Sequence, residues 1–171
     1  MAQDKLEKAK LQFINQWGIL GSAWGINRTM AQIQALLMAS EEALTTDQVM
    51  EGLSISRGNA HSNLKELVQW KLAYIETKAG DRKEYFRGEK DPWKLFRAIS
   101  QERQRREIDP TVETLKSCIE LSKEDDSQEA GVFTEQMTEL LDFIKLADTA
   151  LDNLVTKKQS KLFQWIIQRL A

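Results

Sequence analysis

The feature that most constrains the fold is a pair of short helical patterns separated by a tight turn. The first pattern covers residues 45–53, the turn is Ser54-Ile55, and the second pattern covers residues 56–72. Hydroxyl side chains at a helix start accept hydrogen bonds from free backbone N–H groups, and both patterns open on such residues, two threonines and a serine. Two capped helices with so short a connection predict a helix-turn-helix.

The second helical pattern has two faces of different chemistry. Apolar residues at helical spacing predict a buried face of Ala60, Leu64, Leu67 and Val68. The other side carries small, polar or cationic side chains, most of them near the start of the helix: Ser56, Arg57, Gly58, Asn59, His61, Ser62 and Lys65. A helix that enters a major groove with its first turns leading needs such side chains. We therefore predict that this helix contacts duplex DNA.

Individual roles on that helix follow from side-chain chemistry. Asn59, Ser62 and Lys65 are predicted to face the groove, since asparagine pairs with adenine and lysine with guanine or phosphate. Gly58 allows close approach of the backbone, and Arg57 and His61 are expected to reach bases or phosphates at the rim of the groove.

Strand-forming residues follow at 73–77 and 84–87, on either side of a turn that contains Gly80-Asp81. This pattern predicts a β-hairpin. Its tip carries three cations that we expect to contact phosphates: Lys78, Arg82 and Lys83. A hairpin after a helix-turn-helix is the wing of a winged helix. Residues 53–88 contain seven cations and four anions, a net charge of +3, whereas the whole chain has a net charge of −2. A local basic patch favours a DNA partner.

Several separated motifs resemble the GbsR-type branch of the MarR superfamily of transcriptional regulators. They are residues 56–64 (SRGNAHSNL), 70–72 (WKL) and 80–86 (GDRKEYF), with 24–28 and 33–37 upstream and 91–93 downstream. The resemblance covers residues 13–96. Asn27 stands where the family pattern has proline, and His61 stands where it has a small hydroxyl residue. The resemblance implies a transcriptional regulator, with repression expected ahead of activation.

Helical spacing continues on both sides of the winged helix, so the fold is expected to be mainly α. An N-terminal helix is predicted over 6–24 and the first helix of the winged domain over 28–39. Gly18, Gly21 and Gly25 lower the helix propensity of the first of these, which predicts close approach of another helix, from this chain or from a second subunit.

Residues 91–171 form a helical region with twelve cations and fifteen anions, a net charge of −3. We expect two domains: residues 1–90, with the N-terminal helix and the DNA-binding winged helix, and residues 91–171, a dimerisation region. Its last apolar pattern covers 162–170, and Cys118 is expected to be a buried structural thiol. An acidic helical region with apolar stripes is a poor DNA ligand and a good interface. We therefore predict a homodimer that reads a pseudo-palindromic operator.

The resemblance also implies a small-molecule effector, since the branch includes sensors of choline-type quaternary ammonium compounds. Aromatic side chains bind such cations. Trp17, Trp24 and Trp93 are the candidate effector residues, because they lie at the join between the two predicted lobes. The alternative is that all tryptophans of the chain are core residues at helical spacing.

Other function classes lack a motif. No nucleotide-binding loop or nucleophile elbow is present, so we expect no enzyme and no cofactor. One histidine and one cysteine exclude a site built from those metal ligands. No apolar run approaches the roughly 18–20 residues that span a bilayer, so we expect a cytoplasmic protein with no membrane contact. The alternative to DNA binding is a winged helix that binds another protein.

Overall fold

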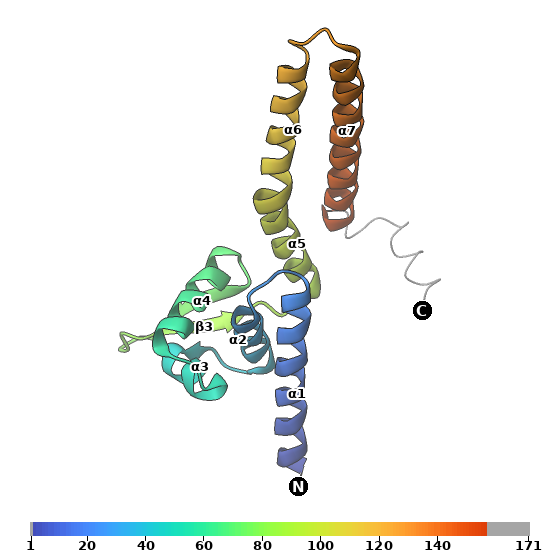
Figure 1. Ribbon diagram of the computed structural model, residues 1–171. Coiled ribbons are helices and arrows are strands. Elements are labelled where there is room, and N and C mark those ends of the chain that lie inside the picture. The colour runs from blue at the N-terminus through green and yellow to red at the C-terminus, as the bar shows by residue number, and fades with distance from the viewer. Residues whose placement is uncertain (1, 157–171) are drawn as a thin grey trace. The chain divides into compact units, whose positions relative to one another are not determined.

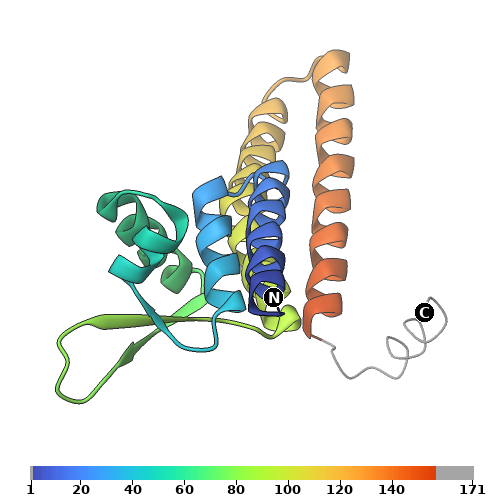
Figure 2. The same cartoon turned by 90° about the horizontal axis from the view of Figure 1, so that it is seen from below.

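The computed structural model describes residues 2–156 (Figures 1 and 2). It divides into two compact units, Met1–Leu95 and Phe96–Ala171. The elements of the first unit are α1 (Ala2–Ala23), α2 (Arg28–Ala39), β1 (Leu44–Thr45), α3 (Thr46–Leu53), α4 (Arg57–Gln69), β2 (Ala73–Thr77) and β3 (Glu84–Gly88). Next come α5 (Pro92–Arg103), which begins in the first unit, the π-helical turn η1 (Gln104–Ile108), α6 (Asp109–Ser122) and α7 (Gln128–Thr156). The chain is mainly α with one small sheet, as the sequence predicts.

The sheet is antiparallel, with strand order β1-β3-β2. The β2–β3 hairpin has the predicted bounds to within one residue and extends from the helices of its unit (Figure 2). The strand β1 was not predicted, because residues 40–44 read as a linker. Its pairs are Leu44 with Phe86 and Thr45 with Tyr85. Two residues are too few to produce an alternating pattern in the sequence.

The core of the first unit lies where the helices cover the sheet. Its largest fully buried side chains come from α2, α3, α4, β3 and the segment after α4: Met30, Ile33, Leu37, Val49, Leu64, Leu67, Leu72 and Phe86. The predicted apolar face of α4 is confirmed, since Ala60, Leu64 and Leu67 are buried, although Val68 is only half-buried. This core fixes α4 with its polar side outward.

The glycines of α1 are explained by α2 of the same chain. A Cβ at Gly21 would lie 2.5 Å from the Cβ of Ala31, and a Cβ at Gly18 would lie 2.6 Å from the Cγ of Gln32. Close approach of a helix is therefore confirmed, and the helix belongs to the same subunit. Gly25 lies beyond the end of α1 with φ +75°, where the N–H of Ile26 donates to the carbonyl of Gly21 at 2.8 Å. A helix end of this kind requires a residue that tolerates a positive φ.

Local hydrogen bonds set the ends of α3 and α4. The Thr45 hydroxyl accepts from the backbone N–H of Gln48, and the Gln48 side chain accepts in return from the N–H of Thr45. This reciprocal arrangement is a capping box. Ser56 caps α4, and Ser54 adopts a left-handed conformation in the turn between the helices, with φ +52°. The predicted caps and turn are thus confirmed.

The second unit is a helical hairpin of α6 and α7. The turn η1 continues directly into α6, and Pro110, which has no backbone N–H to donate, stands in the first turn of α6. Leu115, Ile119 and Leu141 form the buried centre, flanked by Val112, Met137 and Ile144. Cys118 is half-buried, so the expected buried thiol is not found. The pattern predicted at 162–170 lies outside the described residues.

In the described part of the chain, none of the helices combines the length and the apolar character that crossing a bilayer requires.

Candidate nucleic-acid interface

The exposed side of α4 carries the residues predicted to read DNA. Ser56 caps the helix, with its hydroxyl 3.3 Å from the N–H of Asn59. All the others are exposed: Arg57, Gly58, Asn59, His61, Ser62 and Lys65. Nothing lies within 4 Å of a Cβ placed at Gly58, so a partner surface can approach the backbone there. The helix therefore presents a continuous polar surface that begins at its N-terminus.

Asn63 orients Asn59 from within the helix. Asn63 is buried, and its amide donates to the backbone carbonyl of Asn59 at 2.8 Å and to the side-chain oxygen of Asn59 at 2.6 Å. These bonds direct the Asn59 side chain along the helix and leave its NH₂ group as a donor. The Asn59 oxygen keeps a second lone pair. Asn59 can therefore still pair with adenine in two hydrogen bonds. Asn63 thus has a role within the helix.

Two cations of this surface form ion pairs with neighbouring elements. Arg57 pairs with Asp47 in the first turn of α3. The Lys65 Nζ lies 3.1 and 3.2 Å from the two carboxylate oxygens of Glu84, the first residue of β3. All four side chains are well exposed. Sequence reasoning did not identify these carboxylates, since the pairing depends on how α3 and β3 pack beside α4.

The wing tip is ordered by Asp81 and Tyr85. Asp81 accepts from the Tyr85 hydroxyl at 2.7 Å and from the N–H of Lys83 at 2.9 Å. These two hydrogen bonds lower the pKa of Asp81. The bond between the Tyr85 hydroxyl and Asp81 also raises the pKa of Tyr85. Lys78 lies over the Tyr85 ring, 4.3 Å from its centre. Arg82 and Lys83 remain exposed at the tip.

Arg87 has a structural role at the base of the wing. It pairs with Glu76 across the hairpin and donates to the carbonyl of Glu41 at 3.1 Å. Hydrogen bonding to Arg87 lowers the pKa of Glu76, and the same contact raises the pKa of Arg87. The charge of Arg87, which contributes to the basic patch in the sequence, is therefore largely neutralised within the protein.

The three candidate effector tryptophans have different surroundings. The Trp17 indole donates to Gln34 at 3.2 Å, and its ring packs against Phe13 with centroids 5.5 Å apart. Trp24 follows the end of α1 and is exposed, and Trp93 is half-buried in the first turn of α5. The effector site stays a prediction.

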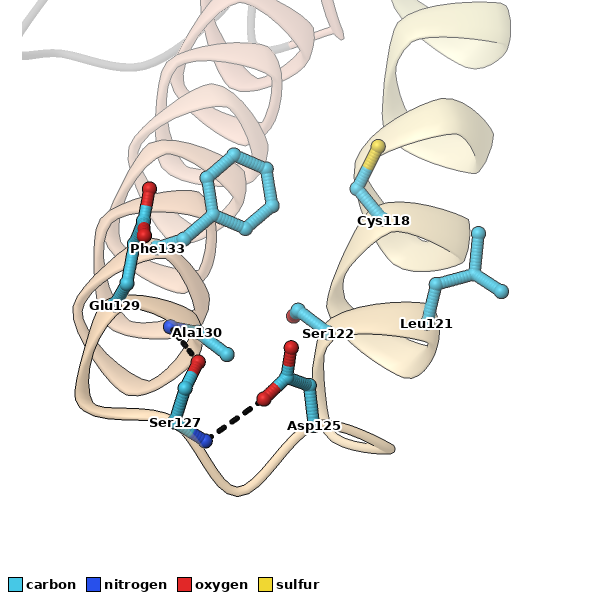
Figure 3. Close-up of a pocket in the computed structure, with 8 residues that line it drawn as sticks. All are labelled: Cys118, Leu121, Ser122, Asp125, Ser127, Glu129, Ala130 and Phe133. Atoms are coloured by element: carbon cyan, nitrogen blue, oxygen red, sulfur yellow. Dashed lines mark hydrogen bonds between the residues drawn. The ribbon is translucent and has the colours of Figure 1, made fainter.

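The second unit contains a pocket at the end of the α6–α7 hairpin (Figure 3). The Phe133 ring points from α7 towards Cys118 on α6, and Asp125 accepts from the N–H of Ser127 at 2.8 Å in the loop below them. That hydrogen bond lowers the pKa of Asp125. None of the lining residues is buried, so a ligand here would stay in contact with solvent, and we assign none. The described residues also contain no cluster of three or more potential metal ligands.

The fold agrees with that of a known regulator. A crystal structure of a transcriptional regulator aligns with 86% of this chain and 95% of its own chain, with a TM-score of 0.59 and 16% sequence identity. The chain has a winged-helix fold. This winged helix runs from α2 to β3 in the order helix, strand, helix, helix, strand, strand.

A second solved structure is less similar to this chain. The apo form of wild-type MarR from E. coli aligns with 99% of this chain and 90% of its own chain, at 12% identity and a TM-score of 0.37. No protein-family model and no curated protein matches the sequence. At 16% identity, the likeness to the transcriptional regulator shows a shared fold.

Proposed function

We propose that this winged-helix protein is a sequence-specific transcriptional regulator that binds a pseudo-palindromic operator as a homodimer. The observation that carries the proposal is the exposed side of α4. It begins at a capped helix end and carries donors and cations that match base edges. The opposite face of the helix is buried at Ala60, Leu64 and Leu67. The exposed cations of the wing tip add phosphate contacts beside it.

The dimer is supported by apolar side chains that the described residues leave uncovered. On the α6–α7 hairpin these are Leu121 of α6 and Val132, Phe133, Leu140, Phe143, Leu146 and Leu151 of α7. So many exposed large apolar residues on one hairpin are typical of a protein interface. A second copy of the chain would cover them through the same surface on each subunit. Such a dimer presents two α4 helices to half-sites about one helical turn apart.

Operator binding also suggests how the protein regulates transcription. Occupying an operator excludes other proteins from the same DNA, so we propose repression as the mode of regulation. We also propose that the protein acts in the cytoplasm and has no catalytic role. The GbsR-type branch of the MarR superfamily is proposed on the motifs in residues 56–64 and 80–86. The competing function is a winged helix that binds only protein.

Removing the interface cations distinguishes the two functions. The test variant is R57Q/K65Q/R82Q/K83Q. The matched control is K8Q/K10Q/K116Q/K123Q. It removes two lysines of α1, one of α6 and one just after α6, each paired with an acidic residue of α1 or α6. Fluorescence anisotropy with labelled duplex should show binding by the wild type and the control and a loss of at least tenfold in the test variant. Equal binding by both variants would contradict the proposal.

A further inference from the structure

The two cations on the reading side of α4 are each held by a carboxylate of the same chain. Arg57 pairs with Asp47 of α3, and Lys65 pairs with Glu84 of β3 at 3.1 Å. Arg57 and Lys65 are eight residues apart on α4, so both lie on the stripe that His61 also occupies. The two carboxylates belong to different elements, α3 and β3. The helix thus carries its cations with their charges already compensated.

Structural support does not account for these pairs. The exposed fractions of the side chains are 68% and 47% for Arg57 and Asp47, and 45% and 44% for Lys65 and Glu84. Ion pairs as exposed as these contribute little to stability and open readily. The α3 helix already has its capping box, and the α4 helix is held by its buried apolar face. The main effect of the pairs is therefore on the charge that α4 presents.

Two of the three wing-tip cations differ from Arg57 and Lys65 in their ion pairing. Lys78 lies 4.0 Å from a carboxylate oxygen of Glu42, whereas no ion pair within the described residues involves Arg82 or Lys83. The wing, which is expected to follow the phosphate backbone, therefore keeps the positive charges of Arg82 and Lys83, whereas the cations of α4 have their charges compensated. Phosphates are present at every sequence, but a matching base edge is present only in the operator.

We propose that Asp47 and Glu84 suppress non-specific DNA binding and so set the ratio of specific to non-specific affinity. The inference rests on the proposed DNA-binding function. On any duplex, Arg57 and Lys65 exchange a carboxylate partner for a phosphate partner, so the net gain in binding free energy is small. The released carboxylates are then repelled by the DNA. On the operator, base contacts made by α4 outweigh this cost. Such a repulsive element that penalises the wrong partner raises specificity.

The experiment compares D47N, E84Q and the double variant with the wild type. Affinity is measured at several salt concentrations for an operator duplex selected from a random library and for a scrambled duplex of the same composition. The matched control is E7Q, which removes an exposed carboxylate that pairs with Lys10 on α1 and changes the net charge equally. Circular dichroism and thermal unfolding verify that each variant is folded.

Each substitution should raise affinity for the scrambled duplex by about three- to tenfold and steepen its salt dependence by roughly one unit. Operator affinity should rise less, so the specificity ratio falls, and E7Q should leave that ratio unchanged. The inference is overturned if D47N and E84Q behave like E7Q. It is also overturned if they weaken operator binding alone, which would mean that the carboxylates orient the cations.

These outcomes separate the inference from the proposed function. A wild type that binds both duplexes equally would overturn the proposed function, and the inference with it. A wild type that discriminates between them, combined with variants that discriminate equally well, would overturn the inference alone. Because E84Q alters the end of a strand and D47N the first turn of a helix, a folding defect in one variant leaves the other as an independent test.

Discussion

At the scale of single residues, the segment that follows the wing depends on one buried carboxylate. Glu89 exposes 8% of its side chain. It accepts from the Tyr74 hydroxyl at 2.7 Å and from the N–H groups of Lys90 and Asp91 at 2.9 Å, and Lys94 lies 3.3 Å away. Burial raises the pKa of Glu89, but these donors together outweigh burial, so the pKa is lowered. The Glu89 side chain ties β2 to the start of α5.

Glu89→Gln should lower the free energy of unfolding by about 1–3 kcal/mol at neutral pH, because the charge of a buried acceptor that receives several hydrogen bonds is lost. A carboxyl whose pKa is lowered in the folded state stabilises the protein above the unfolded pKa of about 4.3 and loses that effect as the pH falls through the folded pKa. The difference between wild type and variant should therefore shrink below about pH 4. Urea unfolding at pH 7 and at acid pH measures it, and a difference independent of pH would refute this role.

The wing gives a second prediction at this scale. Lys83→Gln should weaken binding to every duplex and reduce the slope of log affinity against log salt by roughly one unit, since one phosphate contact is lost. Lys116→Gln on α6, which removes an exposed lysine paired with Glu113, is the control. Titrations at several salt concentrations provide the slopes. An unchanged slope for the Lys83 variant would place Lys83 away from the DNA.

At the scale of secondary-structure elements, the sequence predicted what local chemistry determines. The caps of α3 and α4, the turn at Ser54 and the β2–β3 hairpin each follow from a few adjacent residues. The strand β1 was missed because its two residues are defined only by their pairing with β3. The pairing of Arg57 with Asp47 and of Lys65 with Glu84 was missed for a related reason. It depends on contacts between elements that are distant in the sequence.

Two Gly→Ala substitutions should have opposite effects on stability, because one glycine lies in the contact of α1 with α2 and the other lies in open space on α7. Gly21→Ala should destabilise the protein by about 1–3 kcal/mol, since its Cβ would lie 2.5 Å from that of Ala31 and the helices would have to separate. Gly131→Ala in α7 should stabilise it by about 0.5–1 kcal/mol, because its Cβ would meet nothing within 4 Å and alanine favours helix. Thermal unfolding of both variants tests this. Stabilisation by both would show that α1 does not depend on close packing with α2.

At the scale of the whole molecule, the proposed dimer depends on the exposed apolar residues of α7. Phe143 and Leu146 expose 67% and 68% of their surfaces. The double variant F143E/L146E should shift the protein to monomer without unfolding it, because charges would enter an apolar interface. The control T138E/T149E adds the same charge at two exposed polar positions of the same helix. Sedimentation velocity measures the mass, and dimers that form equally well in both variants would exclude this surface.

The central claim is that a dimer of winged helices reads a specific operator. Selection from a random duplex library with purified protein near physiological salt tests it most directly. The predicted result is an enriched inverted repeat whose half-sites lie about 34–36 Å apart, one helical turn of DNA. Absence of enrichment, with only weak salt-sensitive binding to all sequences, would contradict the claim and favour a winged helix that binds protein.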